Sequence, residues 1–205
     1  MLDKIKLNII SNRKLCENEN LEKQIEKIFS AYERKIILKN FEIVALTLRE
    51  KDLNKNEYLK LIEEIYPICQ KYKINLILHQ NYDLNLDDKY KIDGIHLSYS
   101  IFKSLNQNIK AELIKKYKRI GVSIHSLEEA KDVESLGASY VIAGHIFKTD
   151  CKKGLEPRGL KFVEDLSSTL SIPIYAIGGI DEKNSLSVIN SSAFGVCMMS
   201  SIMKY

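Results

Sequence analysis

The chain has 205 residues, of which 31 are Lys or Arg and 27 are Asp or Glu. This length suits one sizeable hydrophobic core, so we expect a single domain over residues 1–205. A net charge of +4 is too small for the basic surface of a typical nucleic-acid-binding protein. No apolar stretch reaches the roughly 20 residues that cross a bilayer, and the first residues show no signal-peptide pattern. The sequence therefore predicts a cytoplasmic protein with neither nucleic acid nor membrane as a partner.

The cysteines give no sign of a disulfide framework or a zinc site, because they lie far apart without C-x-x-C spacing. Three of them are expected to be small buried side chains, and only Cys151 lies in a polar loop. The four positions are Cys16, Cys69, Cys151 and Cys197.

Apolar runs of strand length recur along the whole chain, rich in β-branched residues. Eight runs are predicted as strands. They cover residues 4–11, 42–50, 74–80, 94–100, 119–126, 139–147, 172–180 and 194–202.

Most of the segments between these runs place apolar residues at the i, i+3, i+4 and i+7 spacing of an amphipathic helix. Ser126 and Glu129 form an S-x-x-E capping box, which predicts a helix start after the fifth strand. The segment 84–92 is too short for a full helix. The predicted helices cover residues 20–34, 54–72, 107–117, 126–137, 158–170 and 181–192.

Strands that are apolar on both faces and alternate with helices indicate a parallel sheet covered by helices. Eight such units predict a (β/α)8 TIM barrel. The last helix is expected to be truncated or absent, because residue 205 follows closely on the eighth strand. A doubly wound open sheet is the competing architecture.

In a barrel of this kind the active site lies at the carboxyl ends of the strands, and the loops after strands seven and eight often hold phosphate. Gly178 and Gly179 follow the seventh strand and allow backbone amides to approach an anion closely. Ser200 and Ser201 follow the eighth strand and offer further donors. A phosphate site is predicted here, with a simple glycine turn as the alternative.

Positive charge is expected at the same end of the barrel. Arg49 and Lys51 follow the second strand, and Lys152 lies in the loop after the sixth. Such a cluster suits a small anionic substrate. The neighbouring Lys153 is expected to be a solvated surface residue.

His145 stands where the sixth strand becomes a polar loop. Its imidazole suits proton transfer near neutral pH, and the alternative is a structural histidine with satisfied hydrogen bonds. His96 and His125 are expected to be structural, the first at a strand centre and the second before the Ser126 cap.

Five segments taken together resemble one known family, the thiamine phosphate synthases. They are 48–51 (LREK), 121–130 (GVSIHSLEEA), 140–154 (YVIAGHIFKTDCKKG), 172–181 (IPIYAIGGID) and 195–202 (GVCMMSSI). The family's fold is a (β/α)8 barrel, which agrees with the strand count.

The resemblance implies a reaction and also raises a difficulty for it. Synthases of this family join a pyrimidine diphosphate to a thiazole phosphate, and two aspartates hold magnesium on the diphosphate. In this chain the corresponding positions are His79-Gln80 and Ser100-Ile101, so both carboxylates are absent. Magnesium needs hard oxygen ligands, which would have to come from shifted positions. The acidic residues available there are Asp83, Asp87 and Asp88.

The loop after the sixth strand is similar to another branch, the thiazole tautomerases of TenI type, with their pattern G-H-x-F-x-T-D-C-K-K-G. This similarity implies an isomerase that aromatises a carboxylated dihydrothiazole phosphate in thiamine biosynthesis. Such an enzyme requires no metal or organic cofactor, and His145 would shuttle the proton.

The resemblance also implies substrate contacts for the predicted site. Phosphate would be held after strands seven and eight, cations would face a carboxylate or the bound anion, and two hydroxyls would add hydrogen bonds. The residues are Gly178, Gly179, Ser200 and Ser201 for phosphate, Arg49, Lys51 and Lys152 for the anion, and Ser123 and Thr149 for hydrogen bonds.

Two other interpretations stay open at this point. One is a thiamine phosphate synthase, and the other is a non-catalytic regulatory barrel that binds a phosphate of the thiamine pathway. A missing last helix would leave part of the barrel wall uncovered, which predicts a homo-oligomer.

Overall fold

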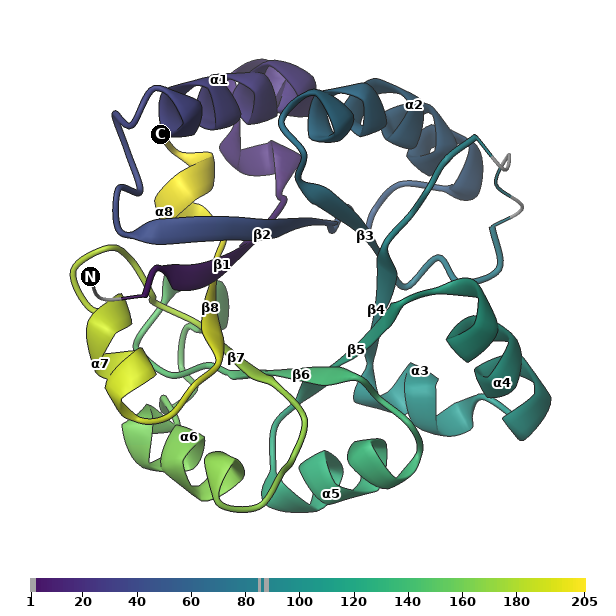
Figure 1. Ribbon diagram of the computed structural model, residues 1–205, viewed down its shortest axis with the longest axis vertical. Coiled ribbons are helices and arrows are strands. Elements are labelled where there is room, and N and C mark those ends of the chain that lie inside the picture. The colour runs from purple at the N-terminus through teal and green to yellow at the C-terminus, as the bar shows by residue number, and fades with distance from the viewer. Residues whose placement is uncertain (1–2, 85, 87–88) are drawn as a thin grey trace.

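The structure, a computed structural model, describes residues 3–84, 86 and 89–205. Across these residues eight strands pair in chain order, each parallel to the next, and the last pairs with the first (Figure 1). The predicted (β/α)8 barrel is therefore confirmed, and the open sheet is excluded. The strands are β1 (Ile5–Ile10), β2 (Phe41–Leu48), β3 (Asn75–His79), β4 (Gly94–Ser98), β5 (Arg119–Ile124), β6 (Tyr140–Gly144), β7 (Ile174–Ile177) and β8 (Gly195–Met198).

The helices surround the ring of strands (Figure 1). The α-helices are α1 (Leu21–Glu33), α2 (Lys55–Lys71), α3 (Tyr99–Ser104), α4 (Gln107–Lys116), α5 (Leu127–Ser135), α6 (Gly159–Ser167), α7 (Ser185–Asn190) and α8 (Ser200–Met203). The short 3-10 helices are η1 (Arg13–Leu15), η2 (Glu17–Glu19) and η3 (Asp150–Lys152).

A side-chain cap starts α5, as its sequence predicts. Ser126 Oγ accepts from the Glu129 amide at 3.1 Å and so caps α5. The Glu129 carboxylate accepts from the His125 amide at 2.6 Å, one residue before the cap, so the reciprocal half of the capping box is shifted. The cap therefore ties α5 directly to the end of β5.

All eight predicted strands extend past the observed carboxyl ends. The run 94–100 contains the end of β4 and the start of α3, where Ser98 Oγ accepts from the Ile101 amide at 3.4 Å. The runs 139–147 and 194–202 likewise continue past β6 and β8. The apolar pattern continues because Ile146 and Ile202 are buried although they lie outside the strands. An apolar sequence indicates a buried residue, and in this barrel buried residues continue from the strands into the loops and α8.

Aromatic side chains fill the amino-terminal half of the barrel interior. Tyr140 and Tyr175 fill the amino-terminal half, with ring centroids 5.8 Å apart, and Tyr175 lies against Phe194 at 5.6 Å. Two further apolar clusters pack the outside of the strands against the helices. The aromatic rings close one end of the barrel interior and leave the carboxyl end free for a cavity.

The last helix is short, as expected. The four residues of α8 lie beside α1, close to the C-terminus (Figure 1). Lys27 of α1 donates a hydrogen bond to the Tyr205 carbonyl at 2.6 Å and lies over its ring. This contact covers part of the wall left by a shorter helix, and the homo-oligomer stays a prediction.

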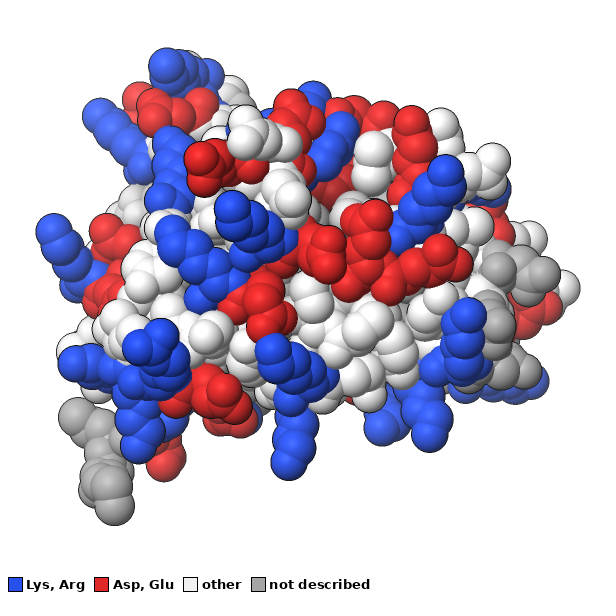
Figure 2. Space-filling view, turned by 90° about the horizontal axis from the view of Figure 1, so that it is seen from above, with Lys and Arg blue, Asp and Glu red and all other residues white. Residues whose placement is uncertain are grey.

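The face seen above α1 and α2 carries mixed charge. Figure 2 shows Lys and Arg interspersed with Asp and Glu there, which agrees with the small net charge. In the part of the chain that the structure describes, no helix is long and apolar enough to span a membrane.

Candidate active site

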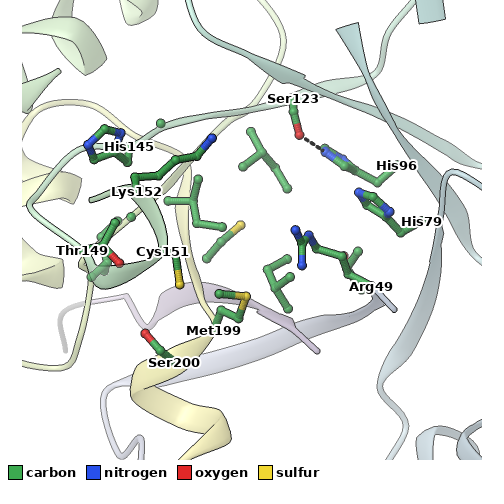
Figure 3. A pocket seen from close by; sticks show the side chains of 18 of the residues that line it. Arg49, His79, His96, Ser123, His145, Thr149, Cys151, Lys152, Met199 and Ser200 are labelled. Carbon is green, nitrogen blue, oxygen red and sulfur yellow. Dashed lines mark hydrogen bonds between the residues drawn. The ribbon is translucent and has the colours of Figure 1, made fainter. Parts of the chain in front are cut away.

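A cavity of about 280 Å³ opens at the carboxyl ends of the strands (Figure 3). Most of the predicted site residues line it, although they come from five different strand ends and loops. Those that line the cavity are Arg49, Lys51, Ser123, His145, Thr149, Lys152, Gly178, Gly179 and Ser200.

Ser201 is the predicted site residue that does not line the cavity. Its hydroxyl donates to the Ile180 carbonyl at 2.9 Å. As the second residue of α8 it is rotated by one helical step from Ser200, so adjacent serines face different surroundings. The expectation that both serines contact phosphate is corrected in this respect.

Three cations meet at the cavity. The Arg49 guanidinium and the Lys152 ammonium extend into it from opposite sides (Figure 3). Burial lowers the pKa of Arg49, and burial together with the charges of Arg49 and Lys152 lowers the pKa of Lys51. Among the described residues, none of the three has a carboxylate within salt-bridge distance. Three mutually repelling cations without a partner make the cavity attractive to an anion.

A buried carboxylate holds the loop that carries Arg49 and Lys51. Glu50 is 4% exposed and points away from the cavity. Its carboxylate accepts from Ser11 Oγ at 2.7 Å and from the Arg13 amide at 3.0 Å, and Arg13 also forms an ion pair with it at 3.2 Å. Ser11 Oγ in turn accepts from the Arg49 amide at 2.7 Å. Hydrogen bonds therefore connect the loops after β1 and β2 next to Arg49 and Lys51.

The glycine pair after β7 is required by packing and backbone conformation. Gly178 has a φ of +107°, and a Cβ there would lie 2.3 Å from His145 Cβ. At Gly179 the φ is +65°, and a Cβ would lie 2.5 Å from the Lys148 carbonyl oxygen. The amides of both glycines make no hydrogen bond recorded within the described residues. They are free to donate to an anion, so the phosphate prediction and the turn explanation are compatible.

The loop after β6 forms the most exposed wall. Thr149 and Cys151 line the cavity next to Lys152, on and beside η3 (Figure 3). Cys151 is exposed, whereas the other three cysteines are buried, as the sequence predicts.

His145 lies at the edge of the cavity and is 9% exposed. Its Nε2 is 3.3 Å from the Leu155 carbonyl oxygen, and its own carbonyl accepts from the Arg158 amide at 2.9 Å. The histidine therefore connects β6 to its long loop, and one of its ring nitrogens is engaged there.

The sequence assigns only His145 to the site, but His79, His96 and His125 line the cavity as well. His79 and His96 are paired in register on β3 and β4, with ring centroids 6.0 Å apart and nearly parallel planes. Burial lowers the pKa of His79 to about 2 and that of His96 to about 3, so both are neutral. His96 was expected to be structural, yet its Nε2 lies 2.7 Å from Ser123 Oγ in the cavity wall. The signal available in the sequence was that both histidines lie in apolar runs of neighbouring predicted strands.

His125 has the structural contacts expected of it, but it also lines the cavity. It precedes the Ser126 cap, and its Nδ1 lies 3.0 Å from the Gly144 carbonyl oxygen. Arg158 Nε donates to the same carbonyl at 3.3 Å. These two contacts fix the end of β6.

The described residues do not fit magnesium. They contain no group of three or more His, Cys, Asp or Glu side chains that could hold a metal ion. Gln80 lines the cavity where the family's carboxylate is expected, and Asp83 is paired with Lys55. Asp87 and Asp88 lie outside the described residues. An amide and a paired carboxylate are poor magnesium ligands.

Fold and site together define a class of protein: a (β/α)8 barrel whose carboxyl end presents a cationic cavity with free backbone amides to a small anion. Sequence comparison gives the family. The chain belongs to the family described as thiamine monophosphate synthase, whose pattern matches residues 7–202. This family belongs to thiamine biosynthesis, and its substrates are small phosphates.

Two curated relatives illustrate the similarity. The thiamine-phosphate synthase of Clostridium acetobutylicum is 30% identical over 198 residues, which cover 97% of this chain and 87% of the relative. A putative thiamine-phosphate synthase 2 of Aquifex aeolicus is 34% identical over 167 residues, covering 81% of this chain and 85% of the relative.

Solved structures support the fold. The thiamine phosphate pyrophosphorylase of Pyrococcus furiosus superposes with a TM-score of 0.78 at 24% identity, covering 99% of this chain and 89% of the other. At this identity the likeness is evidence for the barrel and its strand order alone.

The comparisons correct the predicted enzyme class. The expectation of an isomerase is wrong, because the relatives are named thiamine-phosphate synthases, which are transferases. The isomerase was predicted from the loop pattern after β6 and from the absent carboxylates. The similarity to the synthase of Clostridium acetobutylicum instead extends over nearly the whole chain. The proton-shuttle role of His145 was predicted for that isomerase, and a catalytic role of His145 stays a prediction.

Proposed function

We propose that this chain acts as a thiamine-phosphate synthase, a transferase that joins a pyrimidine diphosphate to a thiazole phosphate. The names of the relatives and the extent of the alignment support this assignment. Both substrates are small anions, and the cationic lining of the cavity suits their charge.

The observation that carries the proposal is the set of three cations that have no carboxylate partner among the described residues. Arg49, Lys51 and Lys152 would neutralise the charge that develops on the departing diphosphate. Charge-assisted hydrogen bonds from a guanidinium to phosphate oxygens are the strongest that this site can supply. Arg49 is the most buried of the three, so its charge is the least screened by solvent.

The groups after β7 and β8 suit the second phosphate. The free amides of Gly178 and Gly179 and the hydroxyl of Ser200 border one end of the cavity. In this arrangement the thiazole phosphate is anchored at β7 and β8, while the diphosphate lies toward β2. The two substrates then meet between the walls, which provides catalysis by proximity.

The absence of a fitting magnesium site among the described residues favours a second candidate. This candidate is a barrel that binds a thiamine-pathway phosphate without transferring it. Its binding surface is the same as that of the synthase, so binding alone does not distinguish the two.

The test combines an activity assay with a binding assay. The chain is incubated with the pyrimidine diphosphate and thiazole phosphate, with magnesium and with a chelator, and thiamine phosphate is measured by chromatography. Binding of thiazole phosphate is measured by calorimetry. The expected result is product formation that falls at least tenfold in Arg49→Ala, with Arg34→Ala as the control arginine outside the cavity.

The remaining outcomes separate the candidates. Binding without product under either condition refutes the synthase and supports the non-catalytic barrel. Neither binding nor product refutes both.

A further inference from the structure

A row of hydrogen bonds leads from the cavity into the barrel interior. Ser123 Oγ, which lines the cavity, lies 2.7 Å from His96 Nε2, and His96 Nδ1 lies 3.3 Å from the Tyr140 hydroxyl (Figure 3 shows the first of these contacts). The three residues belong to β5, β4 and β6, so three neighbouring strands contribute to the row. His96 is 2% exposed and Tyr140 is 4% exposed.

The barrel makes room for this row by means of a glycine. A Cβ on Gly121 would lie 2.0 Å from Tyr140 Cζ and 2.5 Å from His96 Nδ1. Any larger residue at this position of β5 would displace the tyrosine from the histidine. The stacked ring of His79 holds His96 from the other side. Both partners of the buried contact are thus fixed by packing.

The direction of the hydrogen bonds follows from the donors available. Within the part of the chain that the structure describes, His96 Nδ1 is the hydrogen-bond partner recorded for the Tyr140 hydroxyl. A buried O–H without an acceptor is unfavourable, so the tyrosine donates and Nδ1 accepts. The neutral imidazole then carries its proton on Nε2 and donates it to Ser123 Oγ. The serine O–H is left to point at the ligand.

We propose that Tyr140 is a positioning residue that fixes the Nε2–H tautomer of His96 and thereby makes Ser123 a hydrogen-bond donor to an acceptor atom of the bound substrate. In the opposite tautomer the serine would donate to the histidine and could only accept from the ligand. The inference rests on the proposed function for the identity of the ligand, but the tautomer itself is a property of the free protein.

The first test reads the tautomer without any ligand. Long-range nitrogen–proton NMR correlations of the His96 ring are recorded at neutral pH for the wild type, Tyr140→Phe and Tyr175→Phe. We expect the Nε2–H form in the wild type and in Tyr175→Phe, and a mixture of tautomers in Tyr140→Phe. Tyr175 is the matched control, because it loses the same hydroxyl from the same interior cluster while its ring lies against Tyr140.

Two results of this test would overturn the proposal. One is an Nδ1–H tautomer in the wild type. The other is an unchanged Nε2–H tautomer in Tyr140→Phe. Both can be observed whether or not the chain proves to be a synthase, so failure here is distinct from failure of the proposed function.

The second test measures the donor at the cavity. Calorimetric titration with thiazole phosphate is expected to show affinity about tenfold weaker in Ser123→Ala, and restored in Ser123→Thr, which keeps the hydroxyl. Tyr140→Phe is expected to weaken binding by a smaller factor, since it redirects the hydroxyl without removing it. Equal affinity in the wild type and in Ser123→Ala would contradict the donor role.

Discussion

The two walls of the cavity are built by different means. On the β2–β5 side, Arg49, His79, His96 and Ser123 lie on strands β3 to β5 or directly after β2, and buried hydrogen bonds and ring contacts hold them. On the β6–β8 side the wall is formed by a long loop and by the glycine pair, and exposed side chains such as Lys152 extend from it (Figure 3). The first wall is fixed by side chains, whereas the second depends on backbone conformation and leaves its side chains in solvent.

The largest effect is expected where the second wall depends on its backbone. Gly178→Ala combines a strained φ of +107° with a Cβ only 2.3 Å from His145 Cβ. We expect the free energy of unfolding to fall by about 3 kcal/mol, measured by urea denaturation. Gly154→Ala is the matched control, because its φ is +80° but nothing lies within 4 Å of the added Cβ.

The control separates strain from collision. Gly154→Ala is expected to cost about 1 kcal/mol, the conformational part alone. Equal losses in the two variants would show that the close contact with His145 has little effect, and the β6–β7 loop would then be softer than the structure indicates.

The pH dependence of stability tests the first wall. His79 and His96 have pKa values near 2 and 3 when folded, against a value of 6.5 in the unfolded chain. Below about pH 6.5 the unfolded chain therefore takes up protons that the folded chain excludes, and stability is lost as the pH falls. Between about pH 7.5 and 5.5 the pair is expected to remove about 3 kcal/mol of stability, measured by denaturation at each pH.

His79→Gln provides the comparison for this effect. Removal of one buried histidine should reduce the fall in stability between about pH 7.5 and 5.5 by roughly half. A decline as steep as in the wild type would mean that other groups cause it and that His79 titrates freely in the cavity.

Glu50→Gln tests how the first wall is anchored. The substitution keeps the shape but removes the charge opposite Arg13, which is expected to destabilise the fold by about 2 kcal/mol. Weaker binding of inorganic pyrophosphate should accompany this loss, because the joined loops carry Arg49. Asp52→Asn is the control: it faces the same Arg13 from an exposed position, so we expect little change. Similar effects of the two variants would show that burial of Glu50 is unimportant.

The smallest effect is expected at the exposed side chains of the second wall. Lys152→Ala should weaken the binding of inorganic pyrophosphate about fivefold in calorimetry. Lys153→Ala should leave binding unchanged, because this side chain is 81% exposed and does not line the cavity. If Lys153→Ala weakened binding as much as Lys152→Ala does, both lysines would act through the long-range positive potential of the loop rather than through direct contact with the anion.

The sequence by itself determined the order of elements and most of the cavity lining. Alternating apolar strands and amphipathic helices have only a few ways to bury their surfaces, and eight such units close into a barrel. Because the carboxyl ends of parallel strands meet at one end, polar residues after each strand could be assigned to one site without coordinates. This reasoning found Arg49, Lys152 and Gly178, which line the same cavity.

Only the tertiary structure decided which polar side chains face one another. The strand ends at Gly144 and Met198 were not visible in the sequence, because the apolar residues Ile146 and Ile202 beyond them are buried too. Likewise, the row from Ser123 to Tyr140 depends on strand register and on the space left by Gly121, and a one-residue change of register would turn each side chain to the other face. Periodicity records whether a residue is buried, while its partner is set by contacts between segments that are distant in the chain.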